Sequence, residues 1–185
     1  MMKRLFDILI SGFSLLLFSP FLFIIALMIR FSDNGPIFYK QKRVGLNGKS
    51  FEIFKFRSMK INSDKIGPYF TSDNDPRITK IGKFLRKTSI DELPQLLNVL
   101  LNDMSIVGPR PNVPQQESLY TPENWKKRNS VQPGITGLSQ ATLRSDATAD
   151  QRLKMDLYYI DHSRLLFDIK IILMTIMQVI KKGGN

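Results

Sequence analysis

The 185-residue sequence predicts an α+β protein in which an apolar N-terminal helix precedes one compact domain. Three observations support this prediction. Residues 8–29 carry no charge, two runs of aromatic and β-branched residues flank Asn47-Gly48, and turn-forming Pro and Gly separate several helical patterns further along the chain. The hydrophobic fraction of 43% is ordinary for a folded protein, and the length suits about one domain.

The uncharged run from Ile8 to Ile29 predicts a membrane helix. A straight helix of that length reaches roughly 33 Å, which covers the hydrocarbon core of a bilayer. Ser19-Pro20 lies near the middle, where proline removes a backbone hydrogen bond and clashes with the preceding turn. Basic residues stand on both sides of the run, and the positive-inside rule is met most simply when both ends stay in the cytoplasm. The residues alone leave two arrangements open: a re-entrant helix broken at Ser19-Pro20, and a kinked single span.

The chain after the apolar run predicts a β-hairpin followed by short helices. Ile37–Arg43 and Phe51–Met59 are the expected strands, and Asn47-Gly48 supplies the turn between them. Residues 62–76 and the proline-rich residues 107–114 are expected to be loop or extended chain. Helical patterns occupy residues 77–87, 93–101, 151–161 and 165–180. We expect residues 1–32 to form the membrane helix and residues 33–185 to form one domain.

The helix at residues 77–87 is basic and amphipathic. Its apolar face suits a lipid headgroup surface, and it equally suits an ordinary surface helix packed on a core. The pattern at residues 165–180 is strongly apolar but interrupted by polar residues. We therefore expect it to pack or lie on a surface instead of spanning a membrane.

The charge of the chain is unevenly distributed. The formal net charge is +11, and residues 30–87 contribute fourteen basic and five acidic residues to it. A basic stretch directly after an apolar one indicates an anionic membrane surface before it indicates nucleic acid. The chain has no Cys and one His, which excludes disulfides, thiolate metal sites and two-His mechanisms within this chain. A general base or nucleophile is therefore expected to be a carboxylate.

The stretch from Ser89 to Gln95 contains the adjacent carboxylates Asp91 and Glu92. Ser-x-x-Glu is also a capping box, so Ser89 and Glu92 could simply begin a helix. Pro94 is best tolerated in a first turn, and a helix that begins at Asp91 or Glu92 would place both carboxylates near a positive helix end. An Asp there suits two roles, as a ligand of Mg²⁺ and as a nucleophile on phosphorus.

Four arginines stand at predicted turns or element boundaries. They are Arg57, Arg86, Arg110 and Arg144. Planar guanidinium groups are preferred partners of phosphate oxygens, and the flanking prolines of Arg110 hold its backbone stiffly. For each arginine taken singly, a surface charge is the simpler alternative.

The order of these motifs resembles the bacterial sugar transferase family, the monotopic phosphoglycosyl transferases, in its small catalytic-domain-only form. The resemblance covers nearly the whole chain. It rests on Lys3-Arg4-x-x-Asp7, Ser19-Pro20, Arg43-Val44-Gly45-Leu46-Asn47, Lys55-Phe56-Arg57-Ser58-Met59, Ser89 to Gln95, Asn102 to Pro111, and Pro133 to Leu138.

The resemblance implies a function. Family members move a sugar-1-phosphate from a UDP-sugar to polyprenyl (undecaprenyl) phosphate and release UMP. The reaction uses Mg²⁺ and a covalent aspartyl-phosphosugar intermediate, and it is the first membrane step of O-antigen, capsule, exopolysaccharide or glycoprotein synthesis. The resemblance also implies a re-entrant helix and a domain on the cytoplasmic face of the bacterial inner membrane. The expected partners are the UDP-sugar, polyprenyl phosphate and membrane lipids, with no nucleic acid, and the chain could form a homo-oligomer.

The resemblance also assigns roles to residues of this chain. Asp91 matches the family nucleophile, also expected to meet the metal, and Glu92 matches its partner. Lys55, Arg57, Arg86, Arg110 and Arg144 match positions expected near substrate phosphates. Two departures stand out: Leu143-Arg144-Ser145 replaces a frequent Gly-Arg-Asn, and Gln132 replaces a frequent basic residue.

Two other function classes compete with the transferase. A non-enzymatic membrane-surface adaptor would use the apolar helix and the basic stretch for attachment, but it would not need the Asp-Glu and Pro-Arg-Pro stretches. A nucleic-acid-binding protein would use the basic segment, but the apolar N-terminus disfavours it.

Overall fold

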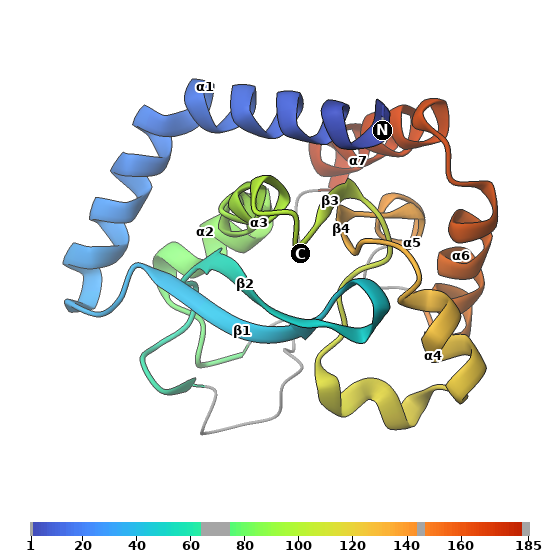
Figure 1. The fold of residues 1–185 in the computed structure, drawn as a ribbon. Coiled ribbons are helices and arrows are strands. Elements are labelled where there is room, and N and C mark those ends of the chain that lie inside the picture. Colours follow the sequence, from blue (N-terminus) through green and yellow to red (C-terminus); the bar gives the residue numbers. More distant parts are fainter. Residues whose placement is uncertain (1, 64–74, 144–146, 183–185) are drawn as a thin grey trace.

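The structure, a computed structural model, describes residues 2–63, 75–143 and 147–182 and confirms the α+β class. The predicted loop at residues 62–76 falls largely outside these residues. Figure 1 shows helices arranged around two small sheets, with the first helix along one side of the molecule. The elements are α1 (Met2–Asp33), β1 (Phe38–Val44), η1 (Leu46–Gly48), β2 (Ser50–Phe56), α2 (Lys80–Thr88), η3 (Ile90–Glu92), α3 (Gln95–Leu100), β3 (Ser105–Val107), η4 (Pro114–Leu119), α4 (Pro122–Arg128), β4 (Gly134–Thr136), α5 (Leu138–Thr142), α6 (Ala149–His162) and α7 (Leu165–Lys182).

Helix α1 is continuous through Pro20 and visibly bent (Figure 1). The predicted break at Ser19-Pro20 is therefore wrong as an interruption of the helix. Pro20 has no N–H for the carbonyl of Leu16, and the Ser19 hydroxyl donates to that carbonyl at 2.8 Å. The freed acceptor is thus satisfied locally and the helix continues. Of the helices that the structure describes, α1 is the one long and apolar enough to cross a membrane.

Polar side chains attach the first turns of α1 to the domain. Asp7 is buried and accepts hydrogen bonds from Ser105 Oγ at 2.8 Å and from the Ile106 N–H at 3.2 Å. Lys3 Nζ lies 2.6 Å from Asp168 Oδ2 in α7. The Lys3-Arg4-x-x-Asp7 motif therefore fixes this end of α1 on β3 and α7.

The far end of α1 also packs on the domain. Ile25 and Ile29 are buried in a cluster with Phe56 at the end of β2 and Leu85 in α2. At its last residue, Asp33 pairs with Arg57. Both ends of α1 therefore contact the same domain, while most of the helix surface between them is exposed.

The predicted hairpin is confirmed. Strands β1 and β2 pair antiparallel from Phe38 opposite Phe56 to Val44 opposite Ser50. Asn47 and Gly48 form the turn with φ angles of 53° and 79°, a left-handed region that Asn and Gly adopt most easily.

A second sheet pairs β3 with β4 in parallel, and the sequence did not predict it. Each strand has three residues, too few for a visible alternation of apolar and polar positions. The pairing requires close backbone approach, because a Cβ on Gly134 would lie 2.1 Å from the Gly108 nitrogen. A buried cluster beside this sheet includes Ile53, Met104 and Tyr159.

Four helical predictions are confirmed with shifted ends, as α2, α3, α6 and α7. Thr79 caps α2 by accepting from the Gly82 N–H, and Thr148 caps α6 by accepting from the Gln151 N–H. Short helices α4 and α5 were not predicted. In α7, Asp168 and Ile171 are buried, whereas Leu166, Leu173 and Ile180 are exposed.

Candidate active site

Asp91 and Glu92 lie in the short 3-10 helix η3, between α2 and α3. Ser89 precedes η3 with a φ of 57° and a ψ of 17°, a left-handed conformation that ends α2 and redirects the chain. Its side chain makes no capping bond to the described residues, so the capping-box interpretation of Ser89 and Glu92 is wrong. Pro94 forms the N-cap of α3, and both carboxylates therefore come just before that helix.

Glu92 is the ion-paired member of the carboxylate pair. Its Oε1 atom lies 2.7 Å from Lys55 Nζ and 2.7 Å from Arg110 Nη2. Burial alone would raise the pKa of Glu92, but the Arg110 guanidinium and the Lys55 ammonium hold that pKa well below its usual range. Glu92 is therefore ionised and fixed between a strand of the hairpin and the loop after β3.

Asp91 is the other member and has a different environment. Its residue surface is 6% exposed, and it forms no salt bridge with a residue in the described ranges. Burial, together with the negative charge of Glu92, raises the pKa of the Asp91 carboxyl, while Lys55, Arg86 and Arg110 act in the opposite direction. Adjacent carboxyls whose pKa values are pushed apart are typical of sites in which the two groups have different roles.

Three of the predicted phosphate-binding residues gather around this pair. Lys55 projects from β2, Arg110 from the loop after β3, and Arg86 from α2. The Arg86 Nε atom donates to Ser58 Oγ at 3.1 Å, and its charge acts on Asp91. The fold therefore brings cations from three separate segments to one carboxylate pair.

Arg57 has other partners. Its two terminal nitrogens each lie 2.5 Å from an oxygen of Asp33, and its Nε donates to the Pro36 carbonyl at 2.6 Å. Arg57 is 6% exposed and holds the end of α1 against the hairpin. A phosphate would have to displace Asp33 to reach this guanidinium. The predicted residue Arg144 lies outside the described residues.

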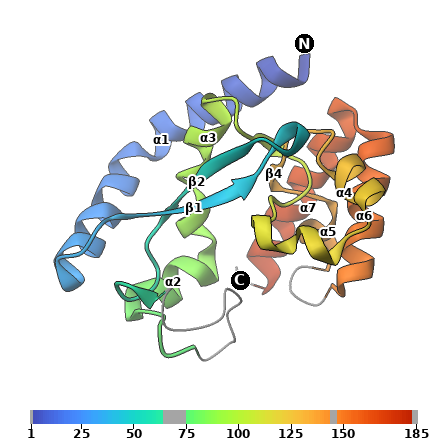
Figure 2. The same cartoon turned by 60° about the horizontal axis from the view of Figure 1, so that its bottom comes forward.

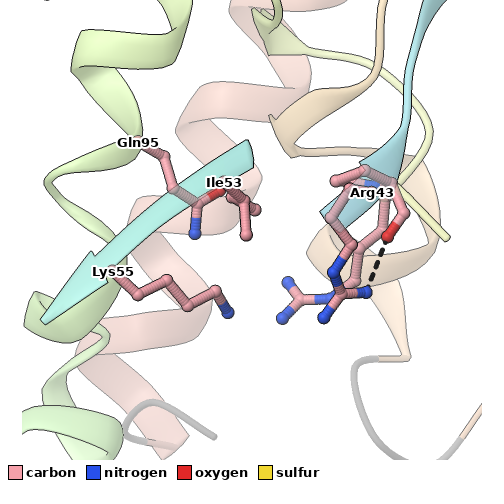
Figure 3. A pocket seen from close by; sticks show the side chains of 6 residues that line it. Arg43, Ile53, Lys55 and Gln95 are labelled. Atoms are coloured by element: carbon pink, nitrogen blue, oxygen red, sulfur yellow. Dashed lines mark hydrogen bonds between the residues drawn. The ribbon is translucent and has the colours of Figure 1, made fainter. Parts of the chain in front are cut away.

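A pocket beside the carboxylate pair adds two polar residues that the sequence analysis did not select. Figure 3 shows the pocket, with Arg43 of β1 on one side and Lys55 of β2 and Gln95 of α3 on the other. Its lining consists of Arg43, Ile53, Lys55, Gln95, Arg110 and Pro111. Arg43 and Gln95 stand inside the motifs quoted above, but only the folded chain shows that they converge.

Arg128 holds the backbone of Arg110 in position. The Arg128 Nη2 atom donates to the Arg110 carbonyl at 2.6 Å, and its Nε lies 2.9 Å from Asp156 Oδ2. Arg128 and Asp156 are both almost completely buried. This ion pair thereby connects α4 and α6 to the Pro109-Arg110-Pro111 loop.

Carboxylates available for a metal are few. The described part of the chain contains no group of three or more His, Cys, Asp or Glu side chains placed to hold a metal ion. Glu92 is occupied by two cations, which leaves Asp91 as the carboxylate of this pair free of a salt bridge to described residues. Mg²⁺ commonly binds through one or two carboxylates plus substrate phosphates and water, and the donor set around Asp91 fits that mode.

Comparisons with known proteins agree on one family. Residues 1–182 match the family described as bacterial sugar transferase. The UDP-glucose:undecaprenyl-phosphate glucose-1-phosphate transferase of Escherichia coli (strain K12) is 43% identical over 186 residues, which cover 96% of this chain and 40% of that protein. The exopolysaccharide production protein PSS of Rhizobium leguminosarum bv. phaseoli is 43% identical over 194 residues, which cover 98% of this chain and 96% of that protein.

A third relative is the undecaprenyl-phosphate glucose phosphotransferase of Komagataeibacter xylinus. It is 43% identical over 191 residues, which cover 96% of this chain and 36% of that protein. The chain thus spans about 40% of the length of the Escherichia coli relative and nearly all of the rhizobial one.

Proposed function

The chain belongs to the bacterial sugar transferase family, and we propose on that premise that it transfers a sugar-1-phosphate from a UDP-sugar to polyprenyl phosphate. The names of the relatives from Escherichia coli and Komagataeibacter xylinus support undecaprenyl phosphate as the acceptor. The name of the relative from Rhizobium leguminosarum supports a place in exopolysaccharide production. The observation that carries the proposal is the asymmetric carboxylate pair: Glu92 is bound by two cations, and Asp91 is buried beside them without a salt bridge to any residue that the structure describes.

We assign the nucleophile to Asp91. An oxygen of its carboxylate attacks the phosphorus that bears the sugar, and the bond from that phosphorus to the bridging oxygen breaks. UMP leaves with the bridging oxygen and its electron pair, and the sugar phosphate remains on Asp91. An oxygen of polyprenyl phosphate then attacks the same phosphorus and displaces the Asp91 carboxylate. The product is a polyprenyl diphosphate sugar, and no external oxidant or reductant is required.

The surrounding residues explain why Asp91 and not Glu92 has this role. Glu92 is held by Lys55 and Arg110, so attack by Glu92 would require both ion pairs to break. The same two cations, together with Arg86, favour the ionised form of Asp91. They also stabilise the negative charge on the oxygens of the transferred phosphoryl group. When Mg²⁺ is bound, it supplies further charge stabilisation to the phosphoryl oxygens, and we propose Asp91 as its protein ligand.

The surface of α1 and α7 supports a shallow membrane location. In α1, Asp7 and Ser11 are buried while Leu9, Phe13 and Leu16 are exposed. Helix α7 likewise buries a carboxylate and exposes leucine and isoleucine, and the Lys3–Asp168 ion pair joins the two helices. Large apolar side chains on the outside and polar ones inside indicate a lipid-facing surface.

We further propose that α1 is re-entrant and that the domain faces the cytoplasm. Support comes from the attachment of both helix ends to one domain, through Asp7 at one end and the Asp33–Arg57 pair at the other. A helix that crossed the bilayer would carry its two ends to opposite sides. The bend in α1 lets it enter the bilayer while both ends remain on the domain.

The proposed activity is tested by UMP release in detergent or lipid. We expect wild-type protein to release UMP from at least one UDP-sugar over repeated turnovers only when Mg²⁺ and polyprenyl phosphate are both present; without polyprenyl phosphate, release should stop after one UMP per protein molecule, because the sugar phosphate stays on Asp91. Asp91→Asn should lower the rate by roughly 10³-fold or more, because the nucleophile is lost. Liposome binding without UMP release from any UDP-sugar in a panel would favour the adaptor instead.

A further inference from the structure

We propose that Arg43 and Gln95 are substrate-binding residues that, with Lys55 and Arg110, form an oxyanion pocket for one phosphoryl group. The proposal rests on the proposed function for the identity of the substrates. The binding chemistry itself follows from the pocket. Neither Arg43 nor Gln95 is among the site residues that the sequence predicted.

The first observation is an unpaired donor. Gln95 begins α3 and is 2% exposed, and its amide nitrogen has no hydrogen-bond partner among the described residues. In Figure 3 the Gln95 side chain reaches into the pocket on the same side as Lys55. Buried side-chain donors are nearly always paired, so an unpaired one that lines a pocket indicates an acceptor supplied by a ligand.

The second observation is a second unpaired donor on the facing wall. Arg43 uses Nη1 to donate to the Pro111 carbonyl at 2.9 Å and Nη2 to donate to Gln41 Oε1 at 2.6 Å. Its Nε is buried and has no partner within the described part of the chain. The two hydrogen bonds hold the guanidinium in place, with the remaining donor available at low entropic cost.

The third observation is an excess of positive charge. Arg43, Lys55 and Arg110 line one pocket, and Glu92 is the carboxylate that pairs with the latter two. Burial and the charge of Arg110 lower the pKa of Arg43 to about 10, because a poorly solvated cation near a second cation is less stable in its charged form. An anion with several acceptor oxygens would satisfy the donors and relieve the repulsion.

The ligand chemistry is therefore a phosphoryl oxyanion. Sulfate-like anions have the same shape, but two of the three cations that line this pocket, Lys55 and Arg110, also act on Asp91, where phosphoryl transfer is proposed. Two sources supply such a group: the diphosphate of the nucleotide sugar and the phosphate of the lipid acceptor. The experiment separates them.

The test uses full-length protein with Gln95→Met, which keeps side-chain length and removes the donor, and with Arg43→Lys, which keeps the charge and removes Nε. Matched controls are Gln132→Met, on a half-buried residue outside the pocket whose side chain bonds Asn102, and Arg164→Lys, on an exposed residue. Binding of inorganic phosphate, UMP, the UDP-sugar and a short-chain polyprenyl phosphate is measured by calorimetry. Thermal melting of each variant checks that it is folded.

We expect Gln95→Met and Arg43→Lys each to weaken phosphate binding by roughly 10- to 100-fold, as for a lost hydrogen bond to a charged group. The controls should bind as wild type does. A parallel loss for UDP-sugar and UMP assigns the pocket to the nucleotide, and a loss confined to polyprenyl phosphate assigns it to the acceptor.

Unchanged affinity for all four probes in folded variants would overturn the inference. If either variant melts early, Gln95→Leu and Arg43→Gln replace it, and unchanged affinity in those folded proteins overturns the inference equally. Phosphate binding that depends on Gln95 and Arg43 in a protein that turns over no UDP-sugar would contradict the proposed function and leave this inference standing.

Discussion

At the scale of single residues, the proposed chemistry depends on two adjacent carboxylates in unlike surroundings. Glu92 is bound by Lys55 and Arg110, whereas Asp91 is buried with a raised pKa. Composition predicted that a carboxylate would act, because the chain has no Cys and a single His. It could not predict which of the two carries the ion pairs, because Lys55 and Arg110 are far from both in the sequence.

Asp91→Asn should stabilise the protein at neutral pH. A folded-state pKa raised above the ordinary value near 3.8 means that ionising Asp91 costs stability as the pH rises through the folded pKa. Relative to the Asn variant, wild-type protein is therefore most stable at pH values below the pKa of Asp91 in the unfolded chain. It loses this advantage as the pH rises through the pKa of Asp91 in the folded protein. Each pKa unit by which folding raises the pKa of Asp91 corresponds to about 1.4 kcal/mol of unfolding free energy. Unfolding midpoints of both proteins at a series of pH values measure this, and a difference that does not change with pH would contradict it.

Glu92→Gln should destabilise the protein at neutral pH, the opposite of the effect expected for Asp91→Asn. The lowered pKa of Glu92 contributes stability above the ordinary value near 4.5, and this contribution is lost as the pH falls. Removing the charge leaves Lys55 and Arg110 buried without their partner, and we expect a loss of roughly 1–3 kcal/mol at neutral pH. The loss should shrink in acid. Thermal or urea unfolding of both proteins at neutral and acid pH provides the check, and an equal loss at both would argue against the ion pairs as its cause.

At the scale of elements, α1 combines an apolar helix long enough to cross a membrane with polar attachments to the domain. The Ser19 hydroxyl satisfies the Leu16 carbonyl that Pro20 leaves without a donor. In water that carbonyl could bond to solvent, but in lipid an unpaired carbonyl is costly. The Ser-Pro pair therefore bends the helix without breaking it.

The attachment at Asp7 can be tested by Asp7→Ala. The change leaves Ser105 Oγ and the Ile106 N–H without their buried acceptor, and we expect a loss of roughly 1–3 kcal/mol. Ser32→Ala, at an exposed residue of the same helix whose hydroxyl bonds the Ile29 carbonyl, is the matched control and should have little effect. Thermal melting in one detergent compares the two, and similar melting temperatures for both variants would remove Asp7 from this role.

The re-entrant topology can be tested by labelling. The native chain has no Cys, so single cysteines at positions 2 and 34 report the side of each end of α1. We expect both to react with a membrane-impermeant reagent from the cytoplasmic side of oriented vesicles. Reaction from opposite sides would establish a plain span and contradict the proposal.

Among the elements, the sequence predicted those that depend on local chemistry. Asn47-Gly48 identified the hairpin, and periodicity identified α2, α3, α6 and α7. It did not predict β3 and β4, whose three-residue strands form because distant segments meet around Gly108 and Gly134. Local signals carry no information about such pairing.

At the scale of the whole molecule, the same contrast applies to the site. Lys55, Arg86 and Arg110 were selected from their motifs, and the fold brings all three to Asp91 and Glu92. Arg57 was selected for the same reason, but its guanidinium pairs with Asp33, a contact that no local pattern indicates. Arg43 and Gln95 were missed because their importance depends on facing one pocket from separate elements.

The arrangement of the molecule also relates the site to the membrane. Helices α1 and α7 expose apolar side chains, and the Lys3–Asp168 ion pair joins the first turn of α1 to α7. Figure 2 shows the hairpin and α2 on the inner side of α1. A shallowly embedded enzyme holds its catalytic residues near the headgroups, where the phosphate of a lipid acceptor lies. On the proposed membrane location, we expect the basic segment at residues 30–87 to add attraction to anionic lipids.

The central claim is that Asp91 becomes covalently bound to the sugar phosphate. Intact-mass measurement of wild-type protein mixed with its UDP-sugar and Mg²⁺, without polyprenyl phosphate, tests it most directly. We predict an added mass of one sugar phosphate, released on addition of polyprenyl phosphate, located on the peptide containing Asp91 and missing from Asp91→Asn. An adduct on Glu92, or full turnover by Asp91→Asn, would contradict the account.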